Sequence, residues 1–181
     1  MLRATLLSCL VGIVLAAEPV VVVASDSLLG DLIRQAGADR VQVHCLVGAG
    51  ADPHHFDPGP RAVADLGQAR LLVVHSRESE PWVDRLVKAS AYAGPVVETA
   101  ATIVDPLRDA HGAIDTHAWH DARAAARMVA AIAEALTAID PEGAAAYAQA
   151  AATADAALRR LDAEIRRDLA DLPASRRILV T

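Results

Sequence analysis

Short apolar runs alternate with amphipathic segments through the first half of the chain. Runs rich in valine and leucine at residues 18–24, 41–47, 70–75 and 95–98 predict four strands. Apolar positions at helical spacing predict helices over 25–36, 61–68 and 81–91, and the Gly/Pro/Asp-rich residues 48–59 predict a loop. This alternation favours an α/β fold with a four-stranded parallel sheet flanked by helices. Ligands of such sheets bind beyond the carboxyl ends of strands, which is where the 48–59 loop begins.

The second half of the chain is helical in pattern. One apolar stripe predicts a helix over residues 121–139, and Asp140 followed by Pro141 predicts the start of another that runs to residue 172. A helix of about 30 residues would be roughly 45 Å long, more than one small lobe requires, so we expect a spine between two lobes. Residues 177–181 predict one further strand, after which we expect the C-terminal lobe to be missing. The expected units are an N-terminal lobe at 18–139, a linking helix at 140–173 and the start of a truncated lobe at 174–181.

The first 17 residues have the pattern of an export signal. Arg3 is followed by an apolar run over residues 4–15 and by the small pair Ala16-Ala17, a typical cleavage site. A first buried strand is the alternative, but the valines at 20–23 already supply one. The segment around Cys9 loosely resembles a lipoprotein attachment box, although the apolar run continues past it. We therefore expect removal of residues 1–17 and a periplasmic or other extracytoplasmic location.

Composition narrows the range of partners. Hydrophobic residues make up 54% of the chain but aromatic ones only 3%, so the core must consist of Val, Leu, Ile and Ala. The formal net charge of −6 argues against nucleic acid or anionic lipid as the partner. Without Cys9, Cys45 has no partner for a disulfide, and we expect it to be a buried, inert thiol. We expect the protein to be a monomer.

Two of the seven histidines share a local pattern. His54 and His117 each follow an Asp-X pair in a predicted loop, and each has an aromatic ring two residues on, Phe56 and Trp119. Neutral imidazole suits Zn, Mn, Fe or Cu, and two such ligands need one or two more groups. Solvated loop histidines are the plain alternative, which this spacing alone does not exclude.

The other candidate residues have secondary roles. Carboxylates that could orient the imidazoles as acceptors are Asp52, Asp57 and Asp115, and possible auxiliary ligands are His55 and His120. The remaining histidines, expected to be structural or solvated, are His44, His75 and His111.

Several segments resemble one family in order and sequence. They are Asp52-Pro53-His54-His55-Phe56-Asp57-Pro58, Ala69-Arg70-Leu71-Leu72-Val73-Val74, Glu80-Pro81-Trp82-Val83-Asp84-Arg85-Leu86, Asp115-Thr116-His117-Ala118-Trp119 and Asp140-Pro141-Glu142. On these segments the chain resembles the zinc- and manganese-binding solute-binding proteins of ABC-type metal importers, the cluster A-I or TroA-like family. The first and fourth segments are the most specific, because in that family they contain metal ligands.

The resemblance implies two α/β lobes joined by a long rigid helix, with Zn²⁺ or Mn²⁺ bound between them and passed to a membrane permease. It implies that His54 and His117 are the two ligands from the N-terminal lobe. In the family, the third ligand is a His or Glu and the fourth is an Asp, and both belong to the C-terminal lobe. The resemblance places the third ligand just beyond residue 181. The chain departs from the family at Thr116, often a proline, and at His75-Ser76-Arg77, which replaces a glycine-containing turn.

Two other interpretations of the histidines remain open. In a metallohydrolase, Asp52 or Asp57 would act as a base beside a zinc-bound water, but the sequence has no H-E-x-x-H helix motif. In a truncated lobe, two ligands alone would bind metal weakly or not at all. We expect no enzymatic activity.

Overall fold

A four-stranded parallel sheet forms the centre of the computed structural model, which describes residues 18–104 and 117–176. The strands are β1 (Val20–Asp26), β2 (Val41–Val47), β3 (Leu71–Val74) and β4 (Val96–Glu98), in the order β2-β1-β3-β4. The predicted α/β class and four parallel strands are therefore confirmed. The chain adds β2 on one side of β1 and β3 on the other, so the strand order reverses between β1 and β3. The loops that follow β1 and β3 therefore begin side by side at the carboxyl end of the sheet, where such sheets bind ligands.

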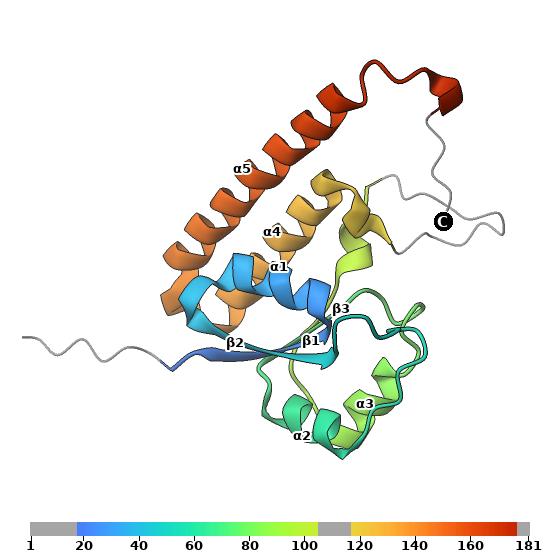
Figure 1. The fold of residues 1–181 in the computed structure, drawn as a ribbon. Helices are drawn as coiled ribbons and strands as arrows, with labels where there is room; N and C mark the ends of the chain where they lie inside the picture. The colour runs from blue at the N-terminus through green and yellow to red at the C-terminus, as the bar shows by residue number, and fades with distance from the viewer. Residues whose placement is uncertain (1–17, 105–116, 177–181) are drawn as a thin grey trace, which may run out of the picture.

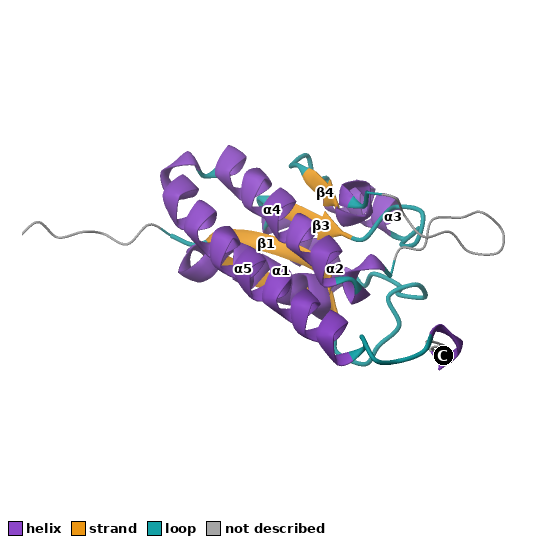
Figure 2. Cartoon of the chain, turned by 90° about the horizontal axis from the view of Figure 1, so that it is seen from above, coloured by secondary structure: helices purple, strands orange, loops and turns teal. Residues whose placement is uncertain are grey.

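Helices cover both faces of the sheet (Figure 1). One face packs against α1 (Ser27–Gly37), α4 (Ala122–Ile139) and α5 (Ala144–Asp168), and the other against α2 (Pro60–Gln68) and α3 (Val83–Ser90). Figure 2, which views the chain from above, shows α5, α4 and α1 running side by side over the strands. Alternate residues of β1 supply the two cores, with Val22 on one side and Val23 on the other, as expected from the two-residue period of a strand.

Short 3₁₀ turns complete the chain. They are η1 (Ala38–Arg40), η2 (Thr99–Thr102), η3 (Ala118–His120), η4 (Pro141–Gly143) and η5 (Ala174–Arg176). Within the described residues, no helix is both long and apolar enough to cross a membrane. The expected signal segment 1–17, the connection 105–116 and the expected strand at 177–181 lie outside the described residues.

Four helices, α1, α3, α4 and α5, begin one to three residues later than the sequence predicts, and side-chain contacts explain the shift for α1 and accompany the one for α5. The helix expected from residue 25 begins at Ser27, because Ser25 and Asp26 continue β1 and the Asp26 side chain caps α1. The helix expected from Pro141 begins as the 3₁₀ turn η4, so the α-helical part is 25 residues, roughly 37 Å. Asp140 does not cap this helix; its carboxylate instead accepts hydrogen bonds from Arg40 and Tyr147.

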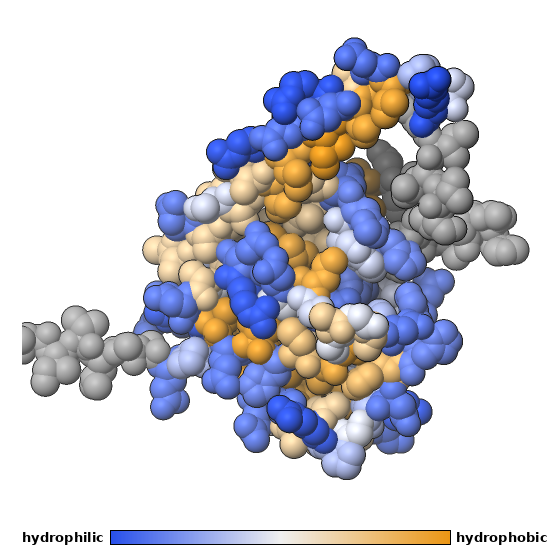
Figure 3. All heavy atoms as spheres, in the orientation of Figure 1, coloured by the Kyte–Doolittle hydropathy of each residue, from blue (hydrophilic) through white to orange (hydrophobic). Residues whose placement is uncertain are grey.

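The outer end of α5 projects beyond the lobe. Its first half packs in the core through Tyr147 and Ala154, whereas Leu161, Ile165 and Leu169 remain 42–46% exposed. Figure 3 shows this apolar surface at the upper end of the molecule, along the projecting part of the helix. The exposed stripe continues the core-facing stripe of the same helix.

Candidate metal site

The two histidines singled out by their sequence pattern lie against each other. His54 is in the loop between β2 and α2, and His117 directly precedes η3 and α4. Their ring centroids are 5.6 Å apart in an edge-to-face arrangement, and both residues are exposed. The fold therefore brings two imidazoles from distant parts of the sequence to one place beyond the carboxyl end of the sheet.

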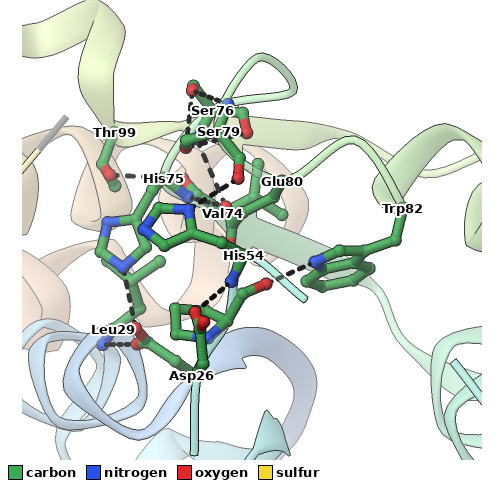
Figure 4. Close-up of polar contacts among 12 residues, drawn as sticks. Asp26, Leu29, His54, Val74, His75, Ser76, Ser79, Glu80, Trp82 and Thr99 are labelled. Atoms are coloured by element: carbon green, nitrogen blue, oxygen red, sulfur yellow. Dashed lines mark hydrogen bonds and ion pairs between the residues drawn. The ribbon is translucent and has the colours of Figure 1, made fainter. Parts of the chain in front are cut away.

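The ring of His54 has a defined orientation and tautomer. Its Nδ1 lies 2.9 Å from the carbonyl oxygen of Ser79 (Figure 4). Because a carbonyl oxygen only accepts, Nδ1 carries the proton and donates, which leaves the lone pair of a neutral ring on Nε2. An imidazole held through one nitrogen by an outer acceptor is the usual arrangement of a metal-ligating histidine. The donor set thus fits a transition metal.

The loop of His54 is fastened to α3 and the turn before it. The indole Nε1 of Trp82 donates to the carbonyl oxygen of Pro53 at 2.8 Å, and the ring of Phe56 packs edge-to-face on Trp82 at 5.0 Å. Arg85 donates to Asp57 at 2.7 Å. An open pocket of about 440 Å³ lies beside this loop, lined by residues of the 54–57 and 81–85 segments. Both sides of the loop are therefore held in place, which limits movement of His54.

Two of the three acidic residues expected to orient the imidazoles lie in the described part of the chain, and neither is seen to accept from the ring of His54. Asp52 accepts from the backbone N–H of His54 at 2.8 Å and from the ring of His55 at 2.7 Å, and these bonds lower the pKa of Asp52. Asp57 pairs with Arg85, and Asp115 lies outside the described residues. The acceptor of the His54 ring is a backbone carbonyl, which no side-chain pattern in the sequence could reveal.

The two candidate auxiliary histidines are neighbours of the pair. The His55 side chain is 86% exposed and engages Asp52, while the His120 ring lies 5.8 Å from Trp119. No group of three or more His, Cys, Asp or Glu side chains within 18–104 and 117–176 is arranged to hold a metal ion. Within these residues the candidate ligands that lie together are therefore the two imidazoles of His54 and His117.

A buried polar cluster lies at the ends of β1 and β3, next to the histidine pair. His75 is 3% exposed, so it is not solvated; its Nε2 lies 2.9 Å from Asp26 Oδ2 (Figure 4). Asp26 also accepts from the backbone N–H of Leu29 at 2.9 Å, through Oδ1. Burial by itself would raise the pKa of Asp26, but the hydrogen bonds from His75 and Leu29 outweigh it and lower that pKa.

Glu80 shapes the turn that follows β3. It is 1% exposed, and its Oε2 accepts from the backbone N–H groups of His75 at 2.6 Å and Ser76 at 3.3 Å. Burial raises the pKa of this carboxyl. The same turn contains the Ser79 carbonyl and the His75 ring. By binding the backbone of this turn, Glu80 helps to fix the position of both groups. The sequence pattern assigned no role to Asp26 or Glu80, although the strand-to-helix position of Asp26 is a recognisable capping signal.

A parallel α/β lobe with two converging imidazoles at its carboxyl edge has the features of a metal-binding protein. The family model described as zinc-uptake complex component A, periplasmic (ZnuA), matches residues 22–181, and the chain belongs to this family. Its members are substrate-binding proteins rather than enzymes, so the metallohydrolase interpretation is not supported.

Relatives with different named metals are similar to the chain. The manganese-binding lipoprotein MntA of Halalkalibacterium halodurans is 30% identical over 164 residues, covering 90% of this chain and 54% of MntA. The iron-binding protein YfeA of Yersinia pestis is 27% identical over 162 residues, covering 88% and 52% respectively. The periplasmic zinc-binding protein TroA of Treponema pallidum superposes with a TM-score of 0.80 at 27% identity, covering 90% and 59%. The chain spans about half the length of the curated relatives it matches.

Proposed function

We propose that this protein captures a divalent transition metal, Zn²⁺ or Mn²⁺, outside the cytoplasm and delivers it to the permease of an ABC importer. The observation that carries the proposal is the approach of the His54 and His117 rings to 5.6 Å, with Nδ1 of His54 already engaged by Ser79. The family to which the chain belongs, and the metals in the names of its relatives, support it.

In this proposal His54 and His117 are direct ligands. Two imidazoles supply two of the four ligands of a four-coordinate site. In this proposal the remaining ligands lie outside the residues that the structure describes. His55 and His120 remain neighbours that could contribute only if their rings turned toward the pair. Asp52 fixes the backbone at His54, and Asp57 fixes the loop through Arg85, so both act on the site indirectly.

The type of ligand atom sets which of the two metals binds more tightly. At a given site of nitrogen ligands, Zn²⁺ binds more tightly than Mn²⁺ by the Irving–Williams order. The two histidines therefore favour zinc, and any preference for manganese has to come from the further ligands. Competition of the two metals for the protein, followed by elemental analysis after dialysis, measures this ranking directly.

The expected division of the chain is part of the same proposal. We infer a signal peptide at 1–17, a metal-binding lobe at 18–139, a linking helix at 140–173 and the beginning of a second lobe at 174–181. The protein acts as a monomer that docks on the permease, with no nucleic-acid partner. The exposed apolar stripe on the outer half of α5 is consistent with a helix that joins two lobes.

Titration of the protein with Zn²⁺ in a calorimeter tests the ligand assignment. Replacing His117 with alanine removes one of two imidazoles, so we expect affinity to fall at least tenfold. The matched control is His44→Ala, which deletes an imidazole on strand β2 that pairs with Asp65 and leaves His54 and His117 in place. Equal Zn²⁺ affinity of His117→Ala and the parent would overturn the ligand assignment. A parent without measurable Zn²⁺ binding would instead support the interpretation that two ligands in a truncated lobe bind metal weakly or not at all.

A further inference from the structure

A buried histidine lies behind the metal ligands, and the metal-binding proposal does not use it. His75 follows β3 directly, and Asp26 ends β1, the neighbouring strand, so their side chains meet at the same edge of the sheet. The His75 ring is 3% exposed and the Asp26 side chain 14%. This is a shielded His–Asp pair within the lobe rather than a surface ion pair.

The pair fixes the tautomer of His75. Asp26 Oδ2 accepts, so Nε2 carries the proton, and in the neutral ring the lone pair lies on Nδ1. This Nδ1 is buried and has no hydrogen-bond partner among the described residues. An unpaired buried polar atom costs free energy, typically about 1–3 kcal/mol. A phenylalanine at position 75 would avoid this cost because its ring has no polar atom. What the histidine adds in return is the hydrogen bond to Asp26.

The bond to Asp26 sets the plane of a ring on which Trp119 rests. The ring centroids of His75 and Trp119 are 4.3 Å apart at an interplanar angle of 43°. Trp119 in turn lies edge-to-face against His117, with centroids 5.1 Å apart. A continuous series of contacts therefore runs from Asp26 through His75 and Trp119 to the ligand His117.

The Asp26 carboxylate is held in place by a second hydrogen bond, so it can fix the orientation of the His75 ring. Its Oδ1 caps α1 through the backbone N–H of Leu29, so the carboxylate cannot turn without loss of the helix cap. The two oxygens of one carboxylate thus connect a helix N-terminus to the ring of His75.

We propose that Asp26 and His75 form a positioning pair that sets the orientation of His117 through Trp119. This inference rests on the proposed role of His117 as a ligand. His75 does not touch the metal in this scheme; it holds the indole that borders the ligand. The His44–Asp65 pair, with Nδ1 of His44 3.3 Å from Asp65 Oδ1, joins strand β2 to helix α2 and takes no part in this series, so it serves as a matched control.

The decisive variant is Asp26→Asn. Asparagine still caps α1 through its oxygen, so the fold is retained, but its NH₂ faces His75 Nε2 and demands an acceptor there. The proton of His75 therefore moves to Nδ1, where the described residues offer no acceptor. We expect His75 to shift or turn, and Trp119 and His117 to follow. His75→Phe is the second variant: it keeps a ring against Trp119 and removes the bond to Asp26.

Two readouts test the inference. Long-range ¹H–¹⁵N spectra of the metal-free protein report the tautomer of His75 and the ring-proton shifts of His117, which the ring current of Trp119 influences. Calorimetry with Zn²⁺ reports affinity. We expect Asp26→Asn and His75→Phe to move the His117 ring protons and to weaken Zn²⁺ binding roughly tenfold, whereas Asp65→Asn changes neither.

A purely structural role would give a different result. If Asp26→Asn lowers the unfolding midpoint but leaves the His117 ring-proton shifts and the Zn²⁺ affinity at parent values, the positioning role is wrong. Should the parent not bind Zn²⁺ at all, the proposed function fails, yet the metal-free spectra still decide whether His75 orients His117. The failure of one proposal is therefore distinguishable from the failure of the other.

Discussion

Glu80 allows a sharp test of how the turn behind the site is held. Its Oε2 is the acceptor for the backbone N–H groups of His75 and Ser76, and the side chain is 1% exposed. Glu80→Ala leaves both amides buried without that acceptor, at about 1–3 kcal/mol for each. We therefore expect the free energy of unfolding to fall by about 2–6 kcal/mol, a large part of the stability of a domain of this size.

Glu80→Gln separates the hydrogen bonds from the charge. The amide oxygen can still accept from both N–H groups, and the NH₂ replaces Oε1, which has no hydrogen-bond partner among the described residues. Burial raises the pKa of Glu80 in the folded protein above its unfolded value of about 4.3. The contribution of Glu80 to stability is therefore complete below that unfolded value and declines as pH rises through the folded pKa. We expect the glutamine variant to gain stability relative to the parent between about pH 4 and pH 7.

Urea unfolding followed by circular dichroism, near pH 4 and near pH 7, measures both effects, provided that the m-value is unchanged. Two results would refute the reasoning. One is an alanine variant within about 0.5 kcal/mol of the parent, which would mean that water or a rearranged turn satisfies the two amides. The other is a glutamine variant as unstable as the alanine variant at neutral pH.

Two further predictions concern packing away from the site. Tyr147→Phe keeps the buried ring but removes the hydroxyl that donates to Asp140 at 2.6 Å; we expect a loss of about 1–2 kcal/mol in urea unfolding, and no loss would mean that the other donors to Asp140 compensate fully. Gly30→Ala would place a Cβ 2.4 Å from the sulfur of Cys45, so crowding should exceed the gain of up to about 1 kcal/mol in helix propensity and destabilise the protein. Adding Cys45→Ala should restore most of that loss in a double-mutant cycle, and additive effects of the two changes would contradict this contact.

Local patterns predicted the elements well because each depends on near neighbours. The second strand, at Val41–Val47, has the predicted bounds, and the last residues of α2 and α4 also agree. Predictions shifted where a side chain had two possible partners. Asp140 has the pattern of a helix cap, yet in the fold its carboxylate binds Arg40, one hundred positions earlier, and Tyr147. No local rule could choose that partner.

The sequence by itself determined the class of fold, the alternation of strands and helices, and the two segments that bear His54 and His117. These follow from hydrophobic period, turn residues and motif spacing, which are properties of short stretches of chain. Only the tertiary structure decided that the two rings meet, that a backbone carbonyl at Ser79 orients one of them, and that a buried Asp26–His75 pair lies behind the other. The physical reason is that these contacts join separate segments through the strand order of the sheet. That order depends on the packing of the whole lobe rather than on any local pattern.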